Sequence, residues 1–538
     1  MKLRIVNIKQ PVSEGDELLP ARVAGLLGLD ARQVLSVRVA RRALDARKKQ
    51  DVHFLLSAVA ELDGAAAKRL LARGNAHVEA YAEVTETPLA TGAEPLRGRV
   101  AVVGLGPAGL FAAHRLAQYG YAPLVLERGD AVERRAERVE RYWATGELDE
   151  RSNVMFGEGG AGTFSDGKLT SRSKDARADQ VMAALVRFGA PGEIAVAAKP
   201  HIGTDRLRGV VSAMRRDIER LGGEVRFRAA LTGLERRNGG LVRAQIATLQ
   251  GTEAVDCAAL VLAVGQGARD TYRMLHDAGV AMAPKPFAVG VRVEHPQDMI
   301  DRAQFGELAG HPRLGAAEYR LSAQSGGRGV YTFCMCPGGR VIASASARDE
   351  VVVNGMSDYA RNAENANAAV VVQVYPSDFA PDPLGGVRFQ QELERAAFLA
   401  GGASGAAPAS TLGAFLRRET PRGFGGVAPS YRPGVAACDL WRVLPPFAAQ
   451  GIAEGMKAFG RQLKGFDRED AVLTGVETRT SAPLRMLRGE NLESVSCAGL
   501  YPVGEGAGCA GGIVSAANDG IRAAEAIIAR FAPPERMV

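Results

Sequence analysis

The sequence predicts a mixed α/β protein, in which a doubly wound, Rossmann-like domain is interrupted by an inserted α+β domain and preceded by an N-terminal ferredoxin-like α+β domain. Three observations support this fold class. Apolar strands alternate with helical patterns over residues 99–280, which is typical of a parallel sheet. Strand-like segments separated by Gly- and Pro-rich loops follow over residues 281–475, and then a strand, a glycine-rich loop and a helix return. Residues 1–95 show the order strand, helix, strand, strand, helix, which begins a ferredoxin-like unit.

These changes of pattern divide the chain into four segments. Residues 1–95 form the ferredoxin-like domain, and residues 96–280 form the first part of the nucleotide-binding domain. Residues 281–475 form the inserted substrate or cap domain, and residues 476–538 form the C-terminal part of the nucleotide-binding domain. Residues 86–98 contain prolines and glycines and are typical of a linker between the first two segments.

Composition excludes several classes of protein. Hydrophobic residues make up 46% of the 538 residues and charged residues 24%, which excludes a disordered or coiled-coil protein. Six cysteines are too few for a disulfide scaffold. No apolar run has the length of a membrane span, and the N-terminal MKLRIVNIKQ lacks the apolar core of a signal peptide, so we expect a cytoplasmic protein. The net charge of +7 is a small excess that does not decide between anionic ligands, nucleic acid and no particular partner.

A dinucleotide-binding turn follows the first apolar strand of the nucleotide-binding domain. Residues 99–109 read RVAVVGLGPAG, so Gly104, Gly106 and Gly109 have the G-x-G-x-x-G spacing. In this spacing the first glycine permits a tight turn, the second lets the main chain approach a pyrophosphate, and the third lets the next helix pack on the strand. Glu127 ends the following strand, close to the spacing of about 20 residues expected for the acid that binds the adenosine ribose. An acid at this position favours FAD or NAD over NADP.

Three further segments favour FAD. Residues 260–267 (LVLAVGQG) form an apolar strand that ends in glycine, as where the chain of a flavoprotein passes back under the cofactor. In residues 499–513, Glu505 follows a strand and Gly504, at the position of the acid that binds the ribitol in flavoproteins of this architecture. The glycine-rich residues 157–168 are suited to place main-chain N–H groups against the pyrophosphate, and a flexible surface loop is the alternative interpretation.

With these segments in place, the chain resembles the glutathione-reductase-like FAD superfamily. Within it, the chain is similar to a family of bacterial and plastid FAD-dependent dehydrogenases that are described only as NAD(P)/FAD-dependent oxidoreductases. The resemblance covers nearly the whole chain and is carried by RRALDARKK, FGEGGAGTFSDGKL, KPFAVGVRVEHPQ, GRGVYTFCMCPGG, NGMS, ETRTSAPLR and YPVGEGAGCAGGIVSAANDG. It implies a doubly wound FAD-binding domain, an inserted second domain and an N-terminal ferredoxin-like module, but no particular substrate.

The resemblance also implies which residues contact FAD. The positions that match the superfamily's contacts are Gly104, Gly106, Pro107, Ala108, Gly109, Glu127, Arg128, Gly160, Thr163, Leu231, Gly265, Gly504, Glu505, Gly512 and Ile513.

Five residues outside the fingerprint are candidates for chemistry. Cys334 and Cys336 form a C-x-C pair: one hypothesis is a redox or nucleophilic thiol pair near the flavin, but the spacing favours two small side chains packed beside a loop. Arg479 and Arg485 are candidates to hold an anionic substrate, with loop hydrogen bonding or surface charge as the alternative. Lys168 is a candidate near the flavin ring, although an exposed lysine is the favoured interpretation. The seven histidines are scattered, and we expect no metal site.

Together these features predict an FAD-dependent oxidoreductase, a dehydrogenase or reductase, that passes a hydride or electrons between FAD and a small organic substrate. Two alternatives remain open: a flavin-dependent RNA-modifying or RNA-binding protein, and an FAD-bound redox sensor or scaffold. The first depends on the basic segment 38–49 and the pI near 9.1. That segment is also a candidate contact for a partner protein, and a solvated hairpin is the favoured interpretation. We expect no membrane, and nucleic acid is not the favoured partner.

Overall fold

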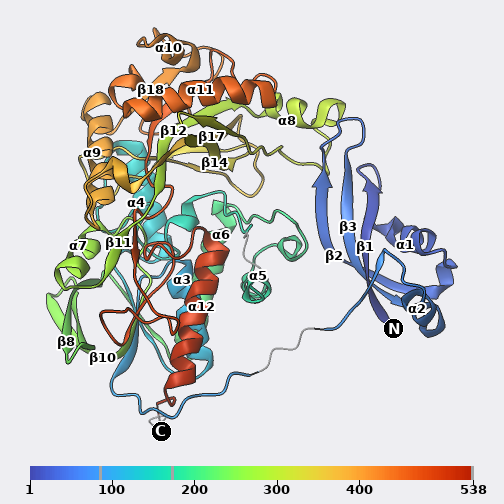
Figure 1. The fold of residues 1–538 in the computed structure, drawn as a ribbon, viewed down its shortest axis with the longest axis horizontal. Helices are drawn as coiled ribbons and strands as arrows, with labels where there is room; N and C mark the ends of the chain where they lie inside the picture. Colours follow the sequence, from blue (N-terminus) through green and yellow to red (C-terminus); the bar gives the residue numbers. More distant parts are fainter. Residues whose placement is uncertain (84–87, 171–174, 535–538) are drawn as a thin grey trace.

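The computed structural model describes residues 1–83, 88–170 and 175–534. In this part of the chain two seven-stranded sheets form the body of the molecule, one above the other in Figure 1, and a four-stranded sheet forms an N-terminal unit beside them. The predicted mixed α/β fold is confirmed. Residues 86 and 87 of the predicted linker 86–98 lie outside the described residues, and the following residues run along the end of the last long helix.

The N-terminal unit is a four-stranded antiparallel sheet with two helices packed against it. Its elements are β1 (Lys2–Pro11), α1 (Leu19–Leu27), β2 (Val34–Asp45), β3 (His53–Leu62), α2 (Gly64–Ala72) and β4 (Val78–Ala80). The strands lie in the order β2-β3-β1-β4. Alternate residues of β1, among them Leu3 and Ile5, are fully buried in the core between sheet and helices. The element order is that of a ferredoxin-like unit.

The lower sheet in Figure 1 carries the predicted dinucleotide-binding turn. Five of its strands pair in parallel in the order β7-β6-β5-β10-β22. Their bounds are β5 (Arg99–Val103), β6 (Leu124–Glu127), β7 (Glu224–Phe227), β10 (Thr252–Leu262) and β22 (Leu500–Pro502). The antiparallel strands β8 (Ala230–Arg237) and β9 (Gly240–Ala247) extend it from β10. The helices α3 (Pro107–Gln118), α6 (Thr204–Arg220) and α12 (Ile513–Arg530) pack together against this sheet.

One predicted strand is two strands in the structure. The resemblance implies one strand from Glu224 to Leu231, with Leu231 near the adenine, but β7 ends at Phe227 and β8 begins at Ala230. Arg228 between them has a φ of 55°, so the chain turns out of the parallel sheet at this residue. The single strand was wrong, because a resemblance between residue types does not show where one strand leaves its neighbour.

The upper sheet in Figure 1 is mostly antiparallel and belongs to the inserted segment. Its strands lie in the order β13-β14-β17-β12-β20-β18-β19. Their bounds are β12 (Phe287–Pro296), β13 (Ser322–Ser325), β14 (Arg328–Cys336), β17 (Asn365–Val374), β18 (Ala407–Thr411), β19 (Val435–Ala437) and β20 (Val472–Glu477). The helix α11 (Pro446–Gln462) covers one face of this sheet. β12 and β17, in the middle of this sheet, are buried along nearly their whole length, which explains their continuous apolar sequence.

Two short strands join the layers. β11 (Met282–Pro284) leads into the upper sheet and β21 (Leu484–Met486) leads back, and the two pair in antiparallel fashion. The remaining elements are α4 (Val132–Thr145), α5 (Arg177–Arg187), α7 (Arg269–Asp277), α8 (Gln297–Phe305), β15 (Arg340–Ala343), β16 (Val353–Met356), α9 (Gly385–Ala400) and α10 (Leu412–Arg417). None of the helices in the described ranges is long and apolar enough to cross a bilayer.

Candidate functional site

A cavity of about 640 Å³ lies between the two seven-stranded sheets, and both contribute to its lining. We call its lower side the glycine wall, which includes Gly104, Gly106, Gly160, Gly265 and Gly512. We call its upper side the side-chain wall, which includes Phe287, Tyr331, Phe333, Cys334, Asn354, Gln373 and Glu477. The glycine wall follows the carboxyl ends of β5, β6 and β10, where doubly wound proteins bind their ligands. The volume is in the range of small-molecule sites.

The turn after β5 has the geometry that its glycine spacing predicts. Gly104 has a φ of 95°, and a Cβ there would lie 2.6 Å from the carbonyl oxygen of Ala263. A Cβ on Gly109 would lie 1.8 Å from the carbonyl oxygen of Gly104, so this glycine lets α3 pack against the turn. Gly106 differs from both, because a Cβ there would meet only the Cα of Gly160, at 3.6 Å. The open space in front of Gly106 belongs to the cavity and fits a pyrophosphate.

Glu127, at the end of β6, ties the turn to the glycine-rich loop. Its carboxylate accepts hydrogen bonds from the main-chain N–H groups of Leu105 at 2.8 Å, Gly129 at 2.8 Å and Gly157 at 3.0 Å. The residue is buried but still lines the cavity. Each carboxylate oxygen has two acceptor positions, so these three hydrogen bonds leave one position, on Oε2, for a ribose hydroxyl.

A buried arginine that the sequence analysis missed holds the glycine-rich loop in shape. The guanidinium of Arg135, on α4, donates to the carbonyl oxygens of Asn153 at 2.9 Å, Glu158 at 2.6 Å and Gly160 at 2.9 Å. Arg135 is fully buried, and burial lowers its pKa to about 9. In the sequence it is one of several arginines on an amphipathic helix, so no local signal marks it.

The C-terminal segment and residues near it complete the glycine wall. Burial raises the pKa of Glu505 to about 7, against the opposing influence of Lys285. The amide Nε2 of Gln266 donates to Glu505 at 3.2 Å and to the main chain of Arg479 at 2.7 Å, while its Oε1 is buried without a hydrogen-bond partner. α12 begins beside these groups, and its N-terminal residues Gly512 and Ile513 line the cavity. The unpartnered acceptor fits a hydrogen-bond donor of a cofactor, and the helix N-terminus fits its negative charge.

Most of the FAD contacts implied by the resemblance lie on this cavity. The lining includes Gly104, Gly106, Pro107, Ala108, Glu127, Arg128, Gly160, Leu231, Gly265, Glu505, Gly512 and Ile513. Gly109, Thr163 and Gly504 are not among the lining residues. Gly109 and Gly504 lie where helices approach the sheet, and Thr163 is buried behind the wall, where its carbonyl oxygen accepts from Thr204 at 2.6 Å. A glycine or threonine that supports a wall has the same local pattern as one that touches the ligand.

The side-chain wall holds one of the two candidate thiols. β14 contains a bulge. Phe333 pairs with Ala369 of β17 and Cys336 pairs with Asn367, so three residues of β14 are opposite two residues of β17. Within the bulge Cys334 has a φ of 43° and lines the cavity, whereas Cys336 is fully buried. The sequence identified both cysteines but not the bulge that separates their environments.

A buried arginine and a buried carboxyl lie directly behind Cys334. Arg292, on β12, donates to the carbonyl oxygen of Cys334 at 2.6 Å and lies 3.4 Å from Glu477, on β20. Burial raises the pKa of Glu477 to about 7, although Arg292 opposes the shift. Glu477 lines the cavity and so presents a group that titrates near neutral pH. Glu477 begins the segment ETRTSAPLR but was not a predicted site residue, because nothing in the sequence shows that it is buried beside Arg292.

The three basic candidates have different environments. Arg479 lines the cavity, but its guanidinium is engaged by Glu350 and Glu394, each at 2.8 Å. Lys168 lines the cavity and lies 2.6 Å from Asp166. Burial opposes its charge, but Asp166 and then Glu318 outweigh burial and raise the pKa of Lys168. Arg485 is exposed on β21 and is not part of the cavity lining.

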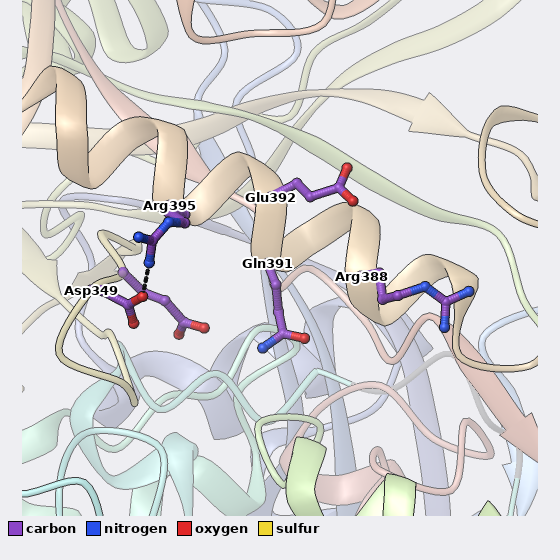
Figure 2. A pocket seen from close by; sticks show the side chains of 6 residues that line it. Asp349, Arg388, Gln391, Glu392 and Arg395 are labelled. Carbon is purple, nitrogen blue, oxygen red and sulfur yellow. Dashed lines mark hydrogen bonds and ion pairs between the residues drawn. The ribbon is translucent and has the colours of Figure 1, made fainter.

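The carboxylates around Arg479 connect the two domains. Arg269, at the start of α7, lies 2.7 Å from Glu394 of α9 and 3.0 Å from Glu350, and the same carboxylates bind Arg479. We call Arg269, Glu350, Glu394 and Arg479 the charge cluster. A second, smaller hollow of about 270 Å³ lies on its outer side, where side chains of α9 face Asp349 (Figure 2). Its walls are mainly charged residues of the surface, and Glu350 is the residue it shares with the charge cluster.

Two predictions concern other kinds of ligand. In the described ranges no group of three or more His, Cys, Asp and Glu residues is placed to hold a metal ion. The basic segment 38–49 contributes nothing to the cavity lining. Within it Arg42 pairs with Asp16 and Arg47 pairs with Asp45, while Lys48 and Lys49 are exposed.

Two family models and one relative of similar length match this chain. A family model described as "FAD-dependent protein, C-terminal domain-like" matches residues 286–480, and a domain of unknown function matches residues 2–61. An "Uncharacterized protein" of Clostridium beijerinckii is 45% identical over 541 residues, covering 99% of this chain and 100% of the relative. The match to the FAD-dependent C-terminal domain, over residues 286–480, spans all the strands of the upper sheet.

Solved structures give only a weak likeness. A flavin-dependent brominase is 13% identical with a TM-score of 0.35, and the match covers 80% of each chain. A geranylgeranyl bacteriochlorophyll reductase-like protein of Thermoplasma acidophilum is 12% identical with a TM-score of 0.34, and the match covers 81% of this chain and 78% of that one. At such low scores these likenesses carry no further conclusion.

Proposed function

Because this chain belongs to the same family as the Clostridium beijerinckii protein and contains the C-terminal domain of FAD-dependent proteins, we propose that it is an FAD-dependent oxidoreductase with a small organic substrate. FAD is its cofactor, as the sequence predicted. One observation carries the proposal: a single cavity is bounded by the glycine wall below and by reactive side chains above. A nucleotide and a second molecule therefore share one space.

The glycine wall supplies the groups that would hold FAD. Gly106 and Gly160 leave room for the pyrophosphate beside the N-terminus of α3, and Glu127 faces the ribose hydroxyls. Gln266 offers its unpartnered Oε1, and Glu505 lies beside it. These groups bind and orient the cofactor, which supplies two-electron chemistry when bound.

The side-chain wall supplies the groups for the substrate. Its aromatic members give an apolar surface, and Asn354 and Gln373 add amide groups that form hydrogen bonds. Arg479, the cationic candidate, is already paired with two carboxylates, so we favour an uncharged, partly apolar substrate over an anion. Glu477 holds a proton below pH 7 and accepts one above it, as a general acid or base requires.

The proposal is tested by reduction of the bound flavin. We expect one fraction of a metabolite extract to bleach the flavin absorption of the purified holoprotein under anaerobic conditions. With that substrate, Glu477→Gln should slow bleaching by about 10²-fold or more, because it removes the proton-transferring group. Glu392→Gln, at an exposed position on α9, is the matched control and should bleach at the wild-type rate. A flavin that remains oxidised with every fraction would contradict the proposed activity.

A further inference from the structure

The bulge in β14 gives the two cysteines complementary positions. Cys334, in the left-handed conformation, lines the cavity, and Cys336 lies behind it with no exposed surface. The Sγ atom of Cys336 lies 3.4 Å from the carbonyl oxygen of Cys334. Bulges and strained residues of this kind recur beside active sites, where they redirect a side chain. An undisturbed strand would have placed both thiols on one face of the sheet.

The charges around Cys334 favour its thiolate. The hydrogen bond from Cys336 lowers the pKa of Cys334, burial opposes the shift, and Arg292 and Lys168 lower it further. Arg292 holds this position firmly, since it is fully buried and donates to the Cys334 carbonyl at 2.6 Å. Reactive cysteines are found in such electropositive, partly exposed surroundings. Cys438 is also partly buried, but there burial raises the thiol pKa.

We propose that Cys334 and Cys336 form a redox-active thiol pair that exchanges two electrons with the bound flavin. Starting from the Cys334 thiolate and the Cys336 thiol, a bond forms between the two Sγ atoms and the S–H bond of Cys336 breaks. The two electrons and the proton pass to the oxidised flavin, which is thereby reduced, and the reverse step restores the thiolate and the thiol. Cys334 faces the cavity and so is the sulfur that meets a substrate, whereas Cys336 resolves the resulting bond. The inference rests on the proposed oxidoreductase function and narrows its substrate to a compound that reacts with thiols.

Alkylation and mass spectrometry of the holoprotein measure the oxidation state of the two thiols. After anaerobic oxidation we expect the peptide with both cysteines to resist iodoacetamide and to weigh two hydrogen atoms less than the reduced peptide. After reduction, Cys334 should react at least about tenfold faster than Cys438 at neutral pH. Reductive titration should consume two electrons beyond those that the flavin takes.

Variants separate a redox pair from two packed side chains. Cys336→Ala and Cys334→Ala should each keep the flavin and each lose the additional two-electron uptake, whereas Cys438→Ala should keep it. Two variants are used because Cys336 is fully buried and its replacement alone could affect folding. Cysteines that take iodoacetamide equally before and after oxidation, with electron uptake equal to the flavin alone, would overturn the pair. If instead the pair oxidises but no substrate reduces the flavin, the proposed function fails and the thiol pair stands.

Discussion

The two walls of the cavity recognise their ligands by different means. The glycine wall consists largely of main chain, held in place by Glu127 and Arg135 through hydrogen bonds to N–H and carbonyl groups. The side-chain wall consists of residues from β12, β14, β16, β17 and β20, which are far apart in the sequence. A main-chain site needs a fixed glycine spacing, so it leaves a motif. A site made of side chains from separate strands leaves none.

The largest effect on stability is expected in the charge cluster. Glu394→Ala removes the carboxylate that lies between Arg269 and Arg479 in the charge cluster and leaves two buried guanidinium groups with fewer partners. We expect the free energy of unfolding to fall by about 3–5 kcal/mol. Chemical denaturation of the purified proteins measures this difference. Glu392→Ala, at an exposed position of the same helix, should change stability by no more than about 0.5 kcal/mol, and equal losses in the two variants would contradict the role of the charge cluster.

A change on the glycine wall should remove the cofactor and leave the fold intact. A valine at Gly106 has room for its Cβ, but its methyl groups extend into the space assigned to the pyrophosphate. We expect Gly106→Val to bind FAD at least about tenfold more weakly, a loss of about 1.4 kcal/mol or more. Absorbance of the purified protein and FAD titration measure this. Phe333→Ala, on the opposite wall, should remain yellow, and a fully loaded Gly106→Val protein would show that the pyrophosphate lies elsewhere.

The side-chain wall should make stability depend on pH. The folded-state pKa of Glu477 is about 7, above the value of about 4.3 for a glutamate in an unfolded chain. The folded protein therefore keeps a proton that the unfolded chain loses, and this stabilisation is complete at low pH and is lost as pH rises to about 7. The loss is about 1.4 kcal/mol for each unit of the shift.

Glu477→Gln should flatten this decline, because glutamine does not titrate. Unfolding midpoints in denaturant at pH 5, 6, 7 and 8, for the wild type and the variant, are the measurement. Glu419→Gln, at an exposed position, should keep the wild-type slope. Parallel pH profiles for wild type and Glu477→Gln would assign the titration to other groups.

The smallest effect is expected for reduction of the flavin by nicotinamide cofactors. Among the described strands, β5 to β7 with β10 and β22 form the parallel sheet that carries a glycine turn, and we propose this site for FAD. In the sequence, Gly265 and Gly267 have the G-x-G spacing but Asp270 stands at the position of the third glycine, and residues 423–426 (GFGG) lack a preceding apolar strand. We therefore expect slow, unsaturable bleaching of the flavin when NADH or NADPH is mixed with the protein without oxygen. Rapid bleaching that saturates at micromolar concentrations would show that the upper sheet binds a second nucleotide.

Sequence alone predicted the lower half of the site better than the upper half. The positions of Gly104, Gly106 and Glu127 followed from local spacing, since each serves a main-chain contact within one β-α-β unit. Glu477 was missed, and the sequence left open whether Arg479 holds an anionic substrate or forms other hydrogen bonds. The charge of each depends on partners such as Arg292 and Glu394, which lie 185 and 85 residues away in the chain. Burial and pairing of that kind are properties of the fold, which no short pattern records.

The same limit applies to the thiols. The C-x-C spacing favoured two packed side chains, because residues two apart in a regular strand point to the same face and a bond between them closes a strained ring. One extra residue in β14 relative to β17 changes this, and a bulge has no reliable signature in the residues that form it. The sequence therefore identified the residues but not their accessibility.

The basic residues of β2, which take no part in the cavity, lie at the edge of the N-terminal sheet. β2 is an outer strand, and only Arg42 along it is bridged to another segment of the described chain, by main-chain hydrogen bonds with Val196 and Ala198. The rest of this edge has unpaired main-chain groups that could join the same edge of another molecule. Arg38 and Arg41 are exposed on that strand, so two such edges would repel each other. We therefore expect the positive charge of β2 to oppose pairing of this edge with the same edge of a neighbouring molecule.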